Sequence, residues 1–504
     1  PDGSRRPLPP SLTRSGARSS RKAVIPSPRS RNGTKQPQKP GAVQAGSGAG
    51  RVTAQHRAGA VPLEVCLLPA GERGLDAVGT GVQLGETAGE LPGVEVAGVD
   101  VVGIEFAGQR VPGRKEAVAG ADVVDIGLSS TDMVYFASGL LDAPAAQFTA
   151  SHNPAQYNGI KLCREGAKPV VTDTGLREIE TLTNEFLATP ASGPLAAADE
   201  RNLMGEWVTH VHSFINPAAL RPLKVVADTA NGMGGFVAPK VFDGLPCDLE
   251  IMYPELDGTF PNHPADPIQP ENLRDLQARV LEVGADIGLA FDGDADRVFL
   301  IDEKAQPISG SITTAMVADA MLRRNPGATI LHNLICSKSV AEVIHEGGGT
   351  AVRTRVGHSF IKQVMAETGA IFGGEHSGHY YFKDNYRADS GIITAMIVLE
   401  LMSESNVTLS ELVKPYQRYV ASGEINTEVP NPAATVDALA TRVAEPGVDA
   451  DRLDGLTVDH GTWWYNVRPS NTEPLLRLNV EAPTEEECAQ RVQEVLTIIE
   501  EVKL

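Results

Sequence analysis

A regular alternation of short apolar runs and amphipathic segments limits what the middle of this chain can fold into. The order of these segments is typical of an α/β layer with a mostly parallel sheet. In such sheets, ligand-binding groups lie at the carboxyl ends of the strands. The loop after the strand at 286–291 is therefore a candidate functional site. The elements predicted in this stretch are strands at 223–228, 249–252 and 286–291, helices at 238–242 and 273–283, and a glycine-rich turn at 231–235.

The loop after that strand carries three aspartates at alternate positions, Asp292, Asp294 and Asp296. Their carboxylate oxygens suit Mg²⁺, which accepts few protein ligands and completes its shell with water and phosphate oxygens. The alternatives are a solvated acidic turn and an EF-hand calcium loop, in which Glu303 would take the closing position. The EF-hand is disfavoured because Arg297 occupies the position of its sharp glycine turn, and because strands are predicted where it needs helices. Arg297 can instead offer its planar guanidinium group to a phosphoryl oxygen.

A second loop, at 149–154, offers a nucleophile. The strand predicted at 145–148 leads directly into it, and Ser151 and His152 stand next to each other in the loop. A serine among such small residues is usually only a loop residue, but a loop at a strand end is well placed to face a cleft. The strand after the next turn brings Lys161 close to this serine, although a lysine at this position can also be a solvated surface residue.

Two later loops carry groups that suit a sugar and a phosphate. Glu375 and Ser377 stand two apart on a glycine-flanked loop at 374–379, so their side chains can accept from and donate to adjacent sugar hydroxyls. A charged hydrogen bond of this kind contributes about 1.5–3 kcal/mol. In the loop at 468–472, a basic side chain with hydroxyls and amides on a tight turn suits a bound phosphate. The residues that would bind it are Arg468, Ser470, Asn471 and Thr472.

These four loops, in this order, resemble the signature loops of the phosphohexomutase family, and within it those of the bacterial phosphomannomutase/phosphoglucomutase group. The resemblance extends from about residue 117 to residue 504. It implies a four-domain α/β architecture, in which three mixed-sheet α/β domains and a smaller C-terminal α+β domain surround a central cleft. The implied segments are 117–200 with the phosphoserine loop, 201–305 with the metal loop, 306–416 with the sugar-recognition loop and 417–504 with the phosphate-binding loop.

The resemblance also implies a reaction. A phosphorylated Ser151 shares Mg²⁺ with the three aspartates and passes its phosphoryl group to a hexose monophosphate. The resulting hexose 1,6-bisphosphate, which also serves as the activator, turns over in the cleft and returns its other phosphate to the serine. Hexose 6-phosphate and hexose 1-phosphate are thereby interconverted, with mannose as the expected sugar. The alternatives are a phosphoglucomutase, a phosphoglucosamine mutase, and an inactive sugar-phosphate binder.

Individual residues receive roles from the same resemblance. His358, at a predicted strand-to-helix junction, is a candidate general base together with Lys161 and His152, and Arg297 belongs to the same reaction centre. The loop at 374–379 reads the 3- and 4-hydroxyls of the sugar, which glucose and mannose share. The implied metal ligands are Ser151, Asp292, Asp294 and Asp296, and the implied substrate-binding residues are Glu375, Ser377, His379, Arg468, Ser470, Asn471 and Thr472.

The distribution of charge argues against some partners. Residues 1–60 carry a formal charge of +11 within a total of −20, which leaves −31 for the remaining chain. So acidic a body is a poor binder of nucleic acids and of membranes, whereas a small sugar phosphate can be held by local cations or a metal. The five cysteines are odd in number, far apart and without CxxC spacing, which favours a reducing compartment and argues against disulfides and zinc. We expect a cytoplasmic monomer or homodimer without a membrane span.

The first part of the chain departs from the family pattern. Residues 1–60 are rich in Pro, Gly, Ser and Arg, and are predicted to be a disordered basic tail. Residues 61–116 have short apolar runs, such as 99–106, but lack the arginine-bearing loop and the Gly-x-Asp-x-Arg loop with which related chains begin. One hypothesis is that this segment is read in a shifted frame. Translation of the upstream DNA in the other two frames tests it.

The other predicted elements continue the alternation. The last helix opens with a capping box at Thr484 and Glu487. One face of this helix is apolar, with Cys488, Val492, Val495, Ile499 and Val502 at helical spacing. The other predicted helices are at 132–141, 175–187, 312–323, 339–345, 359–367 and 436–443, and the strands are at 122–127, 329–333, 350–353, 370–373, 456–458, 463–467 and 475–480.

Overall fold

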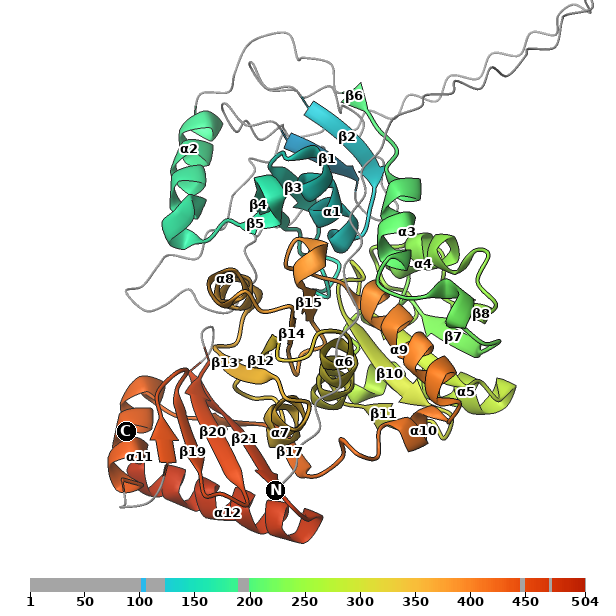
Figure 1. Cartoon of the computed structure of the whole chain (residues 1–504). Coiled ribbons are helices and arrows are strands. Elements are labelled where there is room, and N and C mark those ends of the chain that lie inside the picture. Colours follow the sequence, from blue (N-terminus) through green and yellow to red (C-terminus); the bar gives the residue numbers. More distant parts are fainter. Residues whose placement is uncertain (1–100, 106–122, 189–198, 445–448, 471–473, 504) are drawn as a thin grey trace, which may run out of the picture. The chain divides into compact units, whose positions relative to one another are not determined.

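The computed structural model describes residues 101–105, 123–188, 199–444, 449–470 and 474–503. All of them belong to the second of the chain's two compact units, which begins at Pro62. The predicted tail at 1–60 and most of the atypical segment at 61–116 lie outside the described residues. The described residues of the second unit form four sheets, each with its own helices (Figure 1).

The first sheet has the strand order β5-β4-β3-β1-β2-β6. Strand β1, from the otherwise undescribed atypical segment, pairs in parallel with both β2 and β3. Strands β4 and β5 complete one edge in antiparallel pairing. The elements are β1 (Val101–Glu105), β2 (Val123–Leu128), α1 (Thr131–Leu141), β3 (Ala145–Phe148), β4 (Ile160–Arg164), β5 (Lys168–Pro169), α2 (Leu176–Ala188) and β6 (Asp199–Glu200).

The second sheet has the order β11-β10-β9-β7-β8, with β7 parallel to β8 and β9. Strands β10 and β11 make this sheet mixed, as the family resemblance implied, rather than mostly parallel. Strands β10 and β11 run antiparallel because the tight loop at 292–297 returns the chain directly beside β9, as in a hairpin. The elements are α3 (Met204–His212), β7 (Lys224–Asp228), α4 (Gly234–Phe242), β8 (Asp248–Met252), α5 (Arg274–Val283), β9 (Ile287–Phe291), β10 (Val298–Asp302) and β11 (Pro307–Ile308).

The third sheet, β13-β12-β14-β15-β16, is also mixed. Strand β12 is parallel to β13 and β14, whereas β15 and β16 follow as antiparallel neighbours. The elements are α6 (Gly310–Arg324), β12 (Thr329–Asn333), α7 (Lys338–Glu346), β13 (Thr350–Thr354), α8 (His358–Thr368), β14 (Phe372–Gly374), β15 (Tyr380–Phe382), β16 (Ala388–Asp389), α9 (Gly391–Ser405) and α10 (Leu409–Leu412). Short 3-10 turns occur at Glu165–Ala167, Thr172–Thr174, Pro217–Ala219, Pro270–Leu273 and Lys383–Asn385.

The fourth sheet, β17-β21-β20-β19-β18, is antiparallel throughout and has its own hydrophobic core. Its closing helix begins as predicted, because the Thr484 hydroxyl accepts a hydrogen bond from the Glu487 amide at 3.2 Å. The four-domain α/β architecture is thereby confirmed. The elements are β17 (Val420–Glu428), α11 (Pro432–Arg442), β18 (Asp449–Asp451), β19 (Leu456–Asp459), β20 (Trp464–Pro469), β21 (Leu475–Ala482) and α12 (Glu485–Val502).

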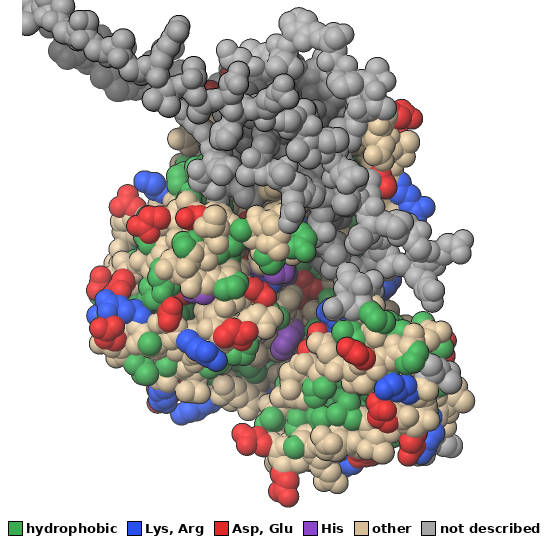
Figure 2. Space-filling view, turned by 180° about the vertical axis from the view of Figure 1, so that it is seen from behind, with side chains coloured by type: hydrophobic (Ala, Val, Ile, Leu, Met, Phe, Trp, Pro, Cys, Tyr) green, Lys and Arg blue, Asp and Glu red, His purple; other side chains and the backbone are tan. Residues whose placement is uncertain are grey.

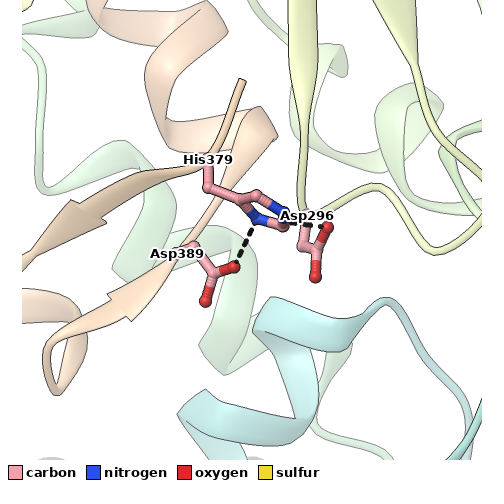
Figure 3. A group of neighbouring side chains, drawn as sticks. All are labelled: Asp296, His379 and Asp389. Atoms are coloured by element: carbon pink, nitrogen blue, oxygen red, sulfur yellow. Dashed lines mark hydrogen bonds and ion pairs between the residues drawn. The ribbon is translucent and has the colours of Figure 1, made fainter. Parts of the chain in front are cut away.

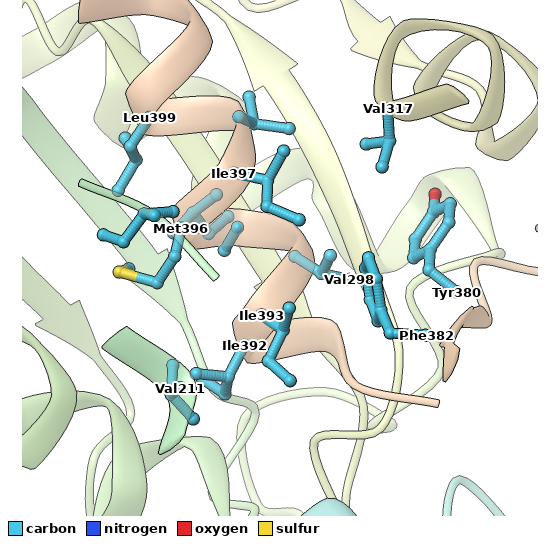
Figure 4. Packing of buried hydrophobic residues seen from close by; sticks show 14 of the residues in the cluster. Val211, Val298, Val317, Tyr380, Phe382, Ile392, Ile393, Met396, Ile397 and Leu399 are labelled. Atoms are coloured by element: carbon cyan, nitrogen blue, oxygen red, sulfur yellow. The ribbon is translucent and has the colours of Figure 1, made fainter. Parts of the chain in front are cut away.

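Helix α9 packs between elements of the second and third α/β segments, and the sequence analysis did not predict it. Its residues 391–402 are all buried, so the segment has no polar face and no amphipathic period to detect. Figure 4 shows its side chains packed among residues of α3, β10, α6 and β15. The residues labelled are Ile392, Ile393, Met396, Ile397 and Leu399 of α9 with Val211, Val298, Val317, Tyr380 and Phe382.

Candidate active site

The acidic loop joins β9 to β10 at the carboxyl end of β9. Its three aspartates are at most 1% exposed, and one carboxylate oxygen of each lies within 4.8 Å of the others. The EF-hand alternative is wrong, because strands rather than helices flank the loop. The side chain of Glu303 turns elsewhere and accepts hydrogen bonds from the amide and hydroxyl of Ser410.

The serine loop meets the acidic loop directly. The Ser151 hydroxyl lies 3.1 Å from Oδ2 of Asp292 and 3.2 Å from Nδ1 of the exposed His152. A side chain at Gly293 would place its Cβ 2.2 Å from the backbone carbonyl oxygen of Ser151, so glycine is required for this approach. A cavity of about 40 Å³ opens between the two loops. Its volume has room for water-sized groups beside the serine.

Lys161 holds the acidic loop from the first sheet. Its ammonium lies 2.7 Å from Oδ2 of both Asp294 and Asp296. Burial lowers its pKa, but the two carboxylates outweigh burial and raise the pKa well above its ordinary value. Thr131, at the start of α1, donates from its hydroxyl to the same oxygen of Asp294 at 2.7 Å.

The three carboxylates have unequal proton affinities. Burial raises the pKa of Asp292 to about 7, against the opposing effect of Arg297. Burial also raises the pKa of Asp294, but the adjacent Lys161 ammonium outweighs it and brings that pKa below its ordinary value. The loop therefore holds negative charge most firmly on the side that faces Lys161.

A divalent cation fits these residues. Oδ1 of Asp294 and Oδ1 of Asp296 are buried and accept no hydrogen bond from any described residue. Buried carboxylate oxygens of this kind are normally paired or bound to a metal. The donor set is entirely hard oxygen, which matches magnesium rather than zinc.

Arg297 is fixed within the loop. Its Nε donates to Oδ2 of Asp292 at 2.9 Å, and its Nη1 lies 3.6 Å from Oδ1 of Asp266. Burial lowers its pKa, but Asp292 and Asp266 raise it above the ordinary value, so the guanidinium is charged. Its Nη2 is buried and makes no hydrogen bond to a described residue, which leaves a donor for a phosphoryl oxygen.

His379 of the loop at 374–379 also reaches this centre. Its Nδ1 lies 2.8 Å from Oδ2 of Asp389 and 3.7 Å from Oδ1 of Asp296 (Figure 3). Burial lowers the pKa of His379, but the two carboxylates raise it above its usual value. These three residues have metal-ligand spacing, yet Asp389 is already neutralised by the Lys362 ammonium at 3.0 Å. The group is therefore better explained as a hydrogen-bonded support than as a second metal site.

Glu375 is only 2% exposed, and both of its carboxylate oxygens are engaged within the protein. The Tyr381 hydroxyl donates to Oε2 at 2.8 Å, and the Gly357 amide donates to Oε1 at 3.1 Å. Each oxygen has a further lone pair for a sugar hydroxyl. Ser377 is half-buried on the same loop. Figure 2 shows histidine side chains within a hollow of the visible face, with acidic and basic groups interspersed around it.

The predicted phosphate loop lies in the fourth sheet. Arg468 is 7% exposed and donates from Nη2 to Glu424 at 2.9 Å, and Arg477 lies 3.5 Å from the Ser470 hydroxyl. Among the charges that act on the pKa of His376, which burial lowers, are Glu424 and Arg468. The sugar and phosphate loops are thus electrostatic neighbours. Asn471 and Thr472 lie outside the described residues, and His358 is placed only as the first residue of α8.

The sequence analysis missed several residues that hold this centre. Thr131, Asp132, Lys362 and Asp389 are buried and polar, and each contacts a residue far from it in the sequence. Local patterns could not reveal these contacts, because each partner is distant in sequence. One signal was available: a buried helix such as α9 needs a cap, and Ser390 provides it beside Asp389.

The contact between Asp132 and Ser390 joins the first and third segments, and the effect of pH on stability can test it. Asp132 on α1 is fully buried, and it accepts hydrogen bonds from Ser130 and from Ser390 of the third segment. Burial raises its pKa to about 7 from 3.8. The folded chain therefore binds this proton more tightly than the unfolded chain, so the contribution to stability is complete below pH 3.8 and is lost as the pH rises through about 7.

We expect Asp132→Asn to remove this pH dependence. The amide is isosteric and stays neutral, and it can accept from one of the two serine hydroxyls while it donates to the other, so the variant gains up to about 4 kcal/mol over the native chain at pH 8. Urea unfolding of both proteins between pH 5 and pH 8 measures the difference. Equal slopes of unfolding free energy against pH in the two proteins would contradict the assignment.

Comparison with known proteins now decides the family. Four models of the phosphoglucomutase/phosphomannomutase family match in chain order: alpha/beta/alpha domain I at 116–188, domain II at 205–306, domain III at 309–419, and the C-terminal domain at 424–498. The chain belongs to the phosphoglucomutase/phosphomannomutase family. As a member, it is a phosphohexomutase, which is an isomerase by reaction class.

Individual members of the family are also similar to this phosphohexomutase. The phosphomannomutase of Escherichia coli (strain K12) is 39% identical over 392 residues, which are 76% of this chain and 86% of the relative. The protein named phosphohexose mutases from Xanthomonas campestris pv. campestris is 38% identical over 386 residues, 76% of this chain and 86% of that one. The crystal structure of a phosphoglucomutase/phosphomannomutase family protein from Burkholderia thailandensis has a TM-score of 0.71 and 30% identity, and covers 80% of this chain and 90% of the other.

Two further observations concern cysteines and membranes. Within the described ranges, Cys163, Cys247, Cys336 and Cys488 are all free thiols, and Cys66 lies outside those ranges. None of the helices in the described part of the phosphohexomutase has both the length and the apolar character that crossing a membrane requires.

Proposed function

We propose that this chain interconverts hexose 6-phosphate and hexose 1-phosphate, with mannose phosphates as the preferred substrates. The observation that carries the proposal is the 3.1 Å approach of the Ser151 hydroxyl to Asp292 at the head of the buried triplet. The preference for mannose is supported by the names of relatives about 40% identical, which are phosphomannomutases. The domain segments proposed are 117–200, 201–305, 306–416 and 417–504.

The proposed site combines four loops. Asp292, Asp294 and Asp296 would hold Mg²⁺ together with a phosphorylated Ser151, and the ion would spread the charge of the transferring group. The three carboxylates with the cations of Lys161 and Arg297 have a formal charge of −1. A divalent ion and a phosphate dianion would leave that balance unchanged, which supports their joint binding.

The chain's own residues carry the transfer. The phosphorus–oxygen bond at Ser151 breaks while a bond to the free sugar hydroxyl forms, and the hydroxyl proton leaves to a base. In the second half, the other phosphate of the hexose 1,6-bisphosphate returns to Ser151. Arg297 directs its buried Nη2 to the transferring group, while Glu375, Ser377 and His379 position the sugar. Arg468 and Ser470, with Asn471 and Thr472, hold the distal phosphate.

The general base is proposed from the contacts of each candidate. His152 is 3.2 Å from the Ser151 hydroxyl, whereas the Lys161 ammonium is held between two carboxylates. Since the pKa of Lys161 lies well above its ordinary value, this lysine remains charged and stabilises charge instead of accepting a proton. Burial lowers the pKa of His152 to about 3, so its imidazole is neutral but weakly basic. His152 and His358 remain the candidates for the base.

The decisive experiment is a mutase assay primed with glucose 1,6-bisphosphate in the presence of Mg²⁺. Mannose 1-phosphate, glucose 1-phosphate and glucosamine 1-phosphate are compared, and intact-mass analysis tests for one phosphoryl group on Ser151. We expect turnover of mannose and glucose phosphates, with the higher kcat/KM for mannose. A metal-loaded, phosphorylated chain that converts none of the three sugars would refute the function. Binding without turnover or phosphoserine would establish the inactive sugar-phosphate binder.

A further inference from the structure

A buried lysine stands behind the loop at 374–379 without belonging to it. The side chain of Lys362, on α8, is 2% exposed, and its ammonium lies 3.0 Å from Oδ1 of Asp389, whose side chain is 3% exposed. The transfer of an ammonium group from water into a protein interior is costly unless the charge is paired. A buried lysine is therefore expected where its charge orients neighbouring side chains.

Lys362 is connected to His379 through Asp389. Asp389 uses Oδ1 for Lys362 and Oδ2 for Nδ1 of His379 at 2.8 Å. Because both oxygens of Asp389 are occupied from fixed directions, the imidazole ring is held in one orientation with its proton on Nδ1. The dashed contacts in Figure 3 show how His379 lies between Asp389 and Asp296.

Lys362 is connected to Glu375 through Tyr381. The Lys362 ammonium lies 5.9 Å from the centroid of the Tyr381 ring, within the range of a cation–π interaction. The hydroxyl of the same tyrosine donates to Oε2 of Glu375 at 2.8 Å. The rings of Tyr381 and His379 also stack, with centroids 6.2 Å apart. Glu375 and His379, the two loop residues proposed to meet the sugar, are therefore both supported by Lys362.

A third contact closes the lysine off from water. The ring of Tyr135, on α1 of the first segment, covers the ammonium at 3.8 Å from the centroid. This distance is typical of a strong cation–π contact, which is worth most when desolvated. Like the hydrogen bond between Ser390 and Asp132, this contact joins the first and third segments.

We propose that Lys362 is a positioning residue for sugar recognition, which fixes His379 through Asp389 and Glu375 through Tyr381. The inference rests on the proposed function, because it assigns Lys362 to the selectivity of that site. Lys362 touches neither the sugar nor the phosphoryl group. Its effect is to hold the two loop residues where the hydroxyls of a hexose phosphate can meet them.

Three variants separate positioning from simple stabilisation. Lys362→Met keeps the length of the side chain but leaves Asp389 buried without its cation, Lys362→Arg keeps the charge, and the double variant Lys362→Met/Asp389→Asn removes both charges together. The matched control is Lys383→Met, because Lys383 is exposed on a turn in the same segment. Each protein is measured for its thermal midpoint and for kcat and KM with glucose 1-phosphate and with its 4-deoxy derivative.

We expect Lys362→Met to lower kcat/KM for glucose 1-phosphate by about 10- to 100-fold, as for the loss of a charged hydrogen bond. Turnover of the 4-deoxy derivative should fall much less, so the discrimination between the two sugars should decrease. Lys362→Arg should retain most of the discrimination, and Lys383→Met all of it. The double variant should regain thermal stability but not discrimination.

Other outcomes overturn the inference. Recovery of both stability and discrimination in the double variant would show that Lys362 only compensates a buried carboxylate. Unchanged discrimination in Lys362→Met would show the same. If Lys362→Met does not fold, the double variant and Lys362→Arg decide by the same comparison. Turnover by the native chain in the same assays reports separately on the proposed function, and an inactive native chain would overturn both.

Discussion

Replacement of Ser151 by alanine is expected to abolish mutase turnover, with a loss in kcat of about 10⁴- to 10⁶-fold, as for other nucleophiles that form covalent intermediates. The hydroxyl is the group that would carry the phosphoryl between the two halves of the reaction. Alanine removes it without adding bulk between the loops, so the acidic triplet keeps its place. Sugar-phosphate binding should therefore persist while turnover is lost.

The measurement is a bisphosphate-primed assay together with intact-mass analysis of the purified variant. Ser405→Ala is the matched control, since this serine is exposed near the end of α9 and its hydroxyl contacts only the backbone of the same helix. The control should keep native turnover and the native phosphoserine signal. A phosphorylated and active Ser151→Ala protein would place the nucleophile elsewhere.

Removal of the metal is expected to have an effect of similar size. Chelation with EDTA should stop turnover, and Mg²⁺ should restore it. Three carboxylates that are at most 1% exposed repel one another, so the ion should also stabilise the fold. At a concentration of 100 times its Kd, Mg²⁺ should add about 2.7 kcal/mol to the free energy of unfolding.

Asp296→Asn distinguishes a bound ion from a general salt effect. The loss of a direct ligand should weaken Mg²⁺ binding by about 100-fold or more, since even the partners of ligands cost 10- to 100-fold. Titration calorimetry gives the affinity, and thermal unfolding with and without Mg²⁺ gives a readout independent of activity. Asp248→Asn, an exposed change of the same charge on β8, should behave like the native chain. Equal affinities in all three proteins would exclude the triplet as the metal site.

Local patterns in the sequence predicted most elements and the order of the loops. The strand at 286–291 is uniformly apolar and ends in alternating aspartates, so both its burial and the chemistry of its end are local properties. The capping box at Thr484 is similarly local. Helix α9 escaped prediction because complete burial removes the periodic pattern. The antiparallel direction of β10 was not predicted, although it follows from the six-residue loop 292–297, which is too short for a parallel crossover.

The residues that support the candidate site could not be predicted from local sequence patterns. Lys362 lies on a helix, where a lysine is normally solvated, and its role depends on Asp389 and on Tyr135 of helix α1 in the first segment. Glu375 was expected to accept hydrogen bonds from sugar hydroxyls, and the donors Tyr381 and Gly357, which also bind it, were not predicted. Pairings of this kind depend on how separate segments pack, and a single sequence does not encode them in any local pattern.

The backbone at Ser151 has a further consequence for which alcohol can serve there. Its φ of 53° lies in the left-handed region, which a β-branched side chain adopts only with strain. Threonine carries the same hydroxyl chemistry, but its extra methyl group would distort the turn that presents the oxygen to Asp292. The backbone conformation at position 151, rather than the reactivity of the hydroxyl, thus favours the primary alcohol of serine over threonine.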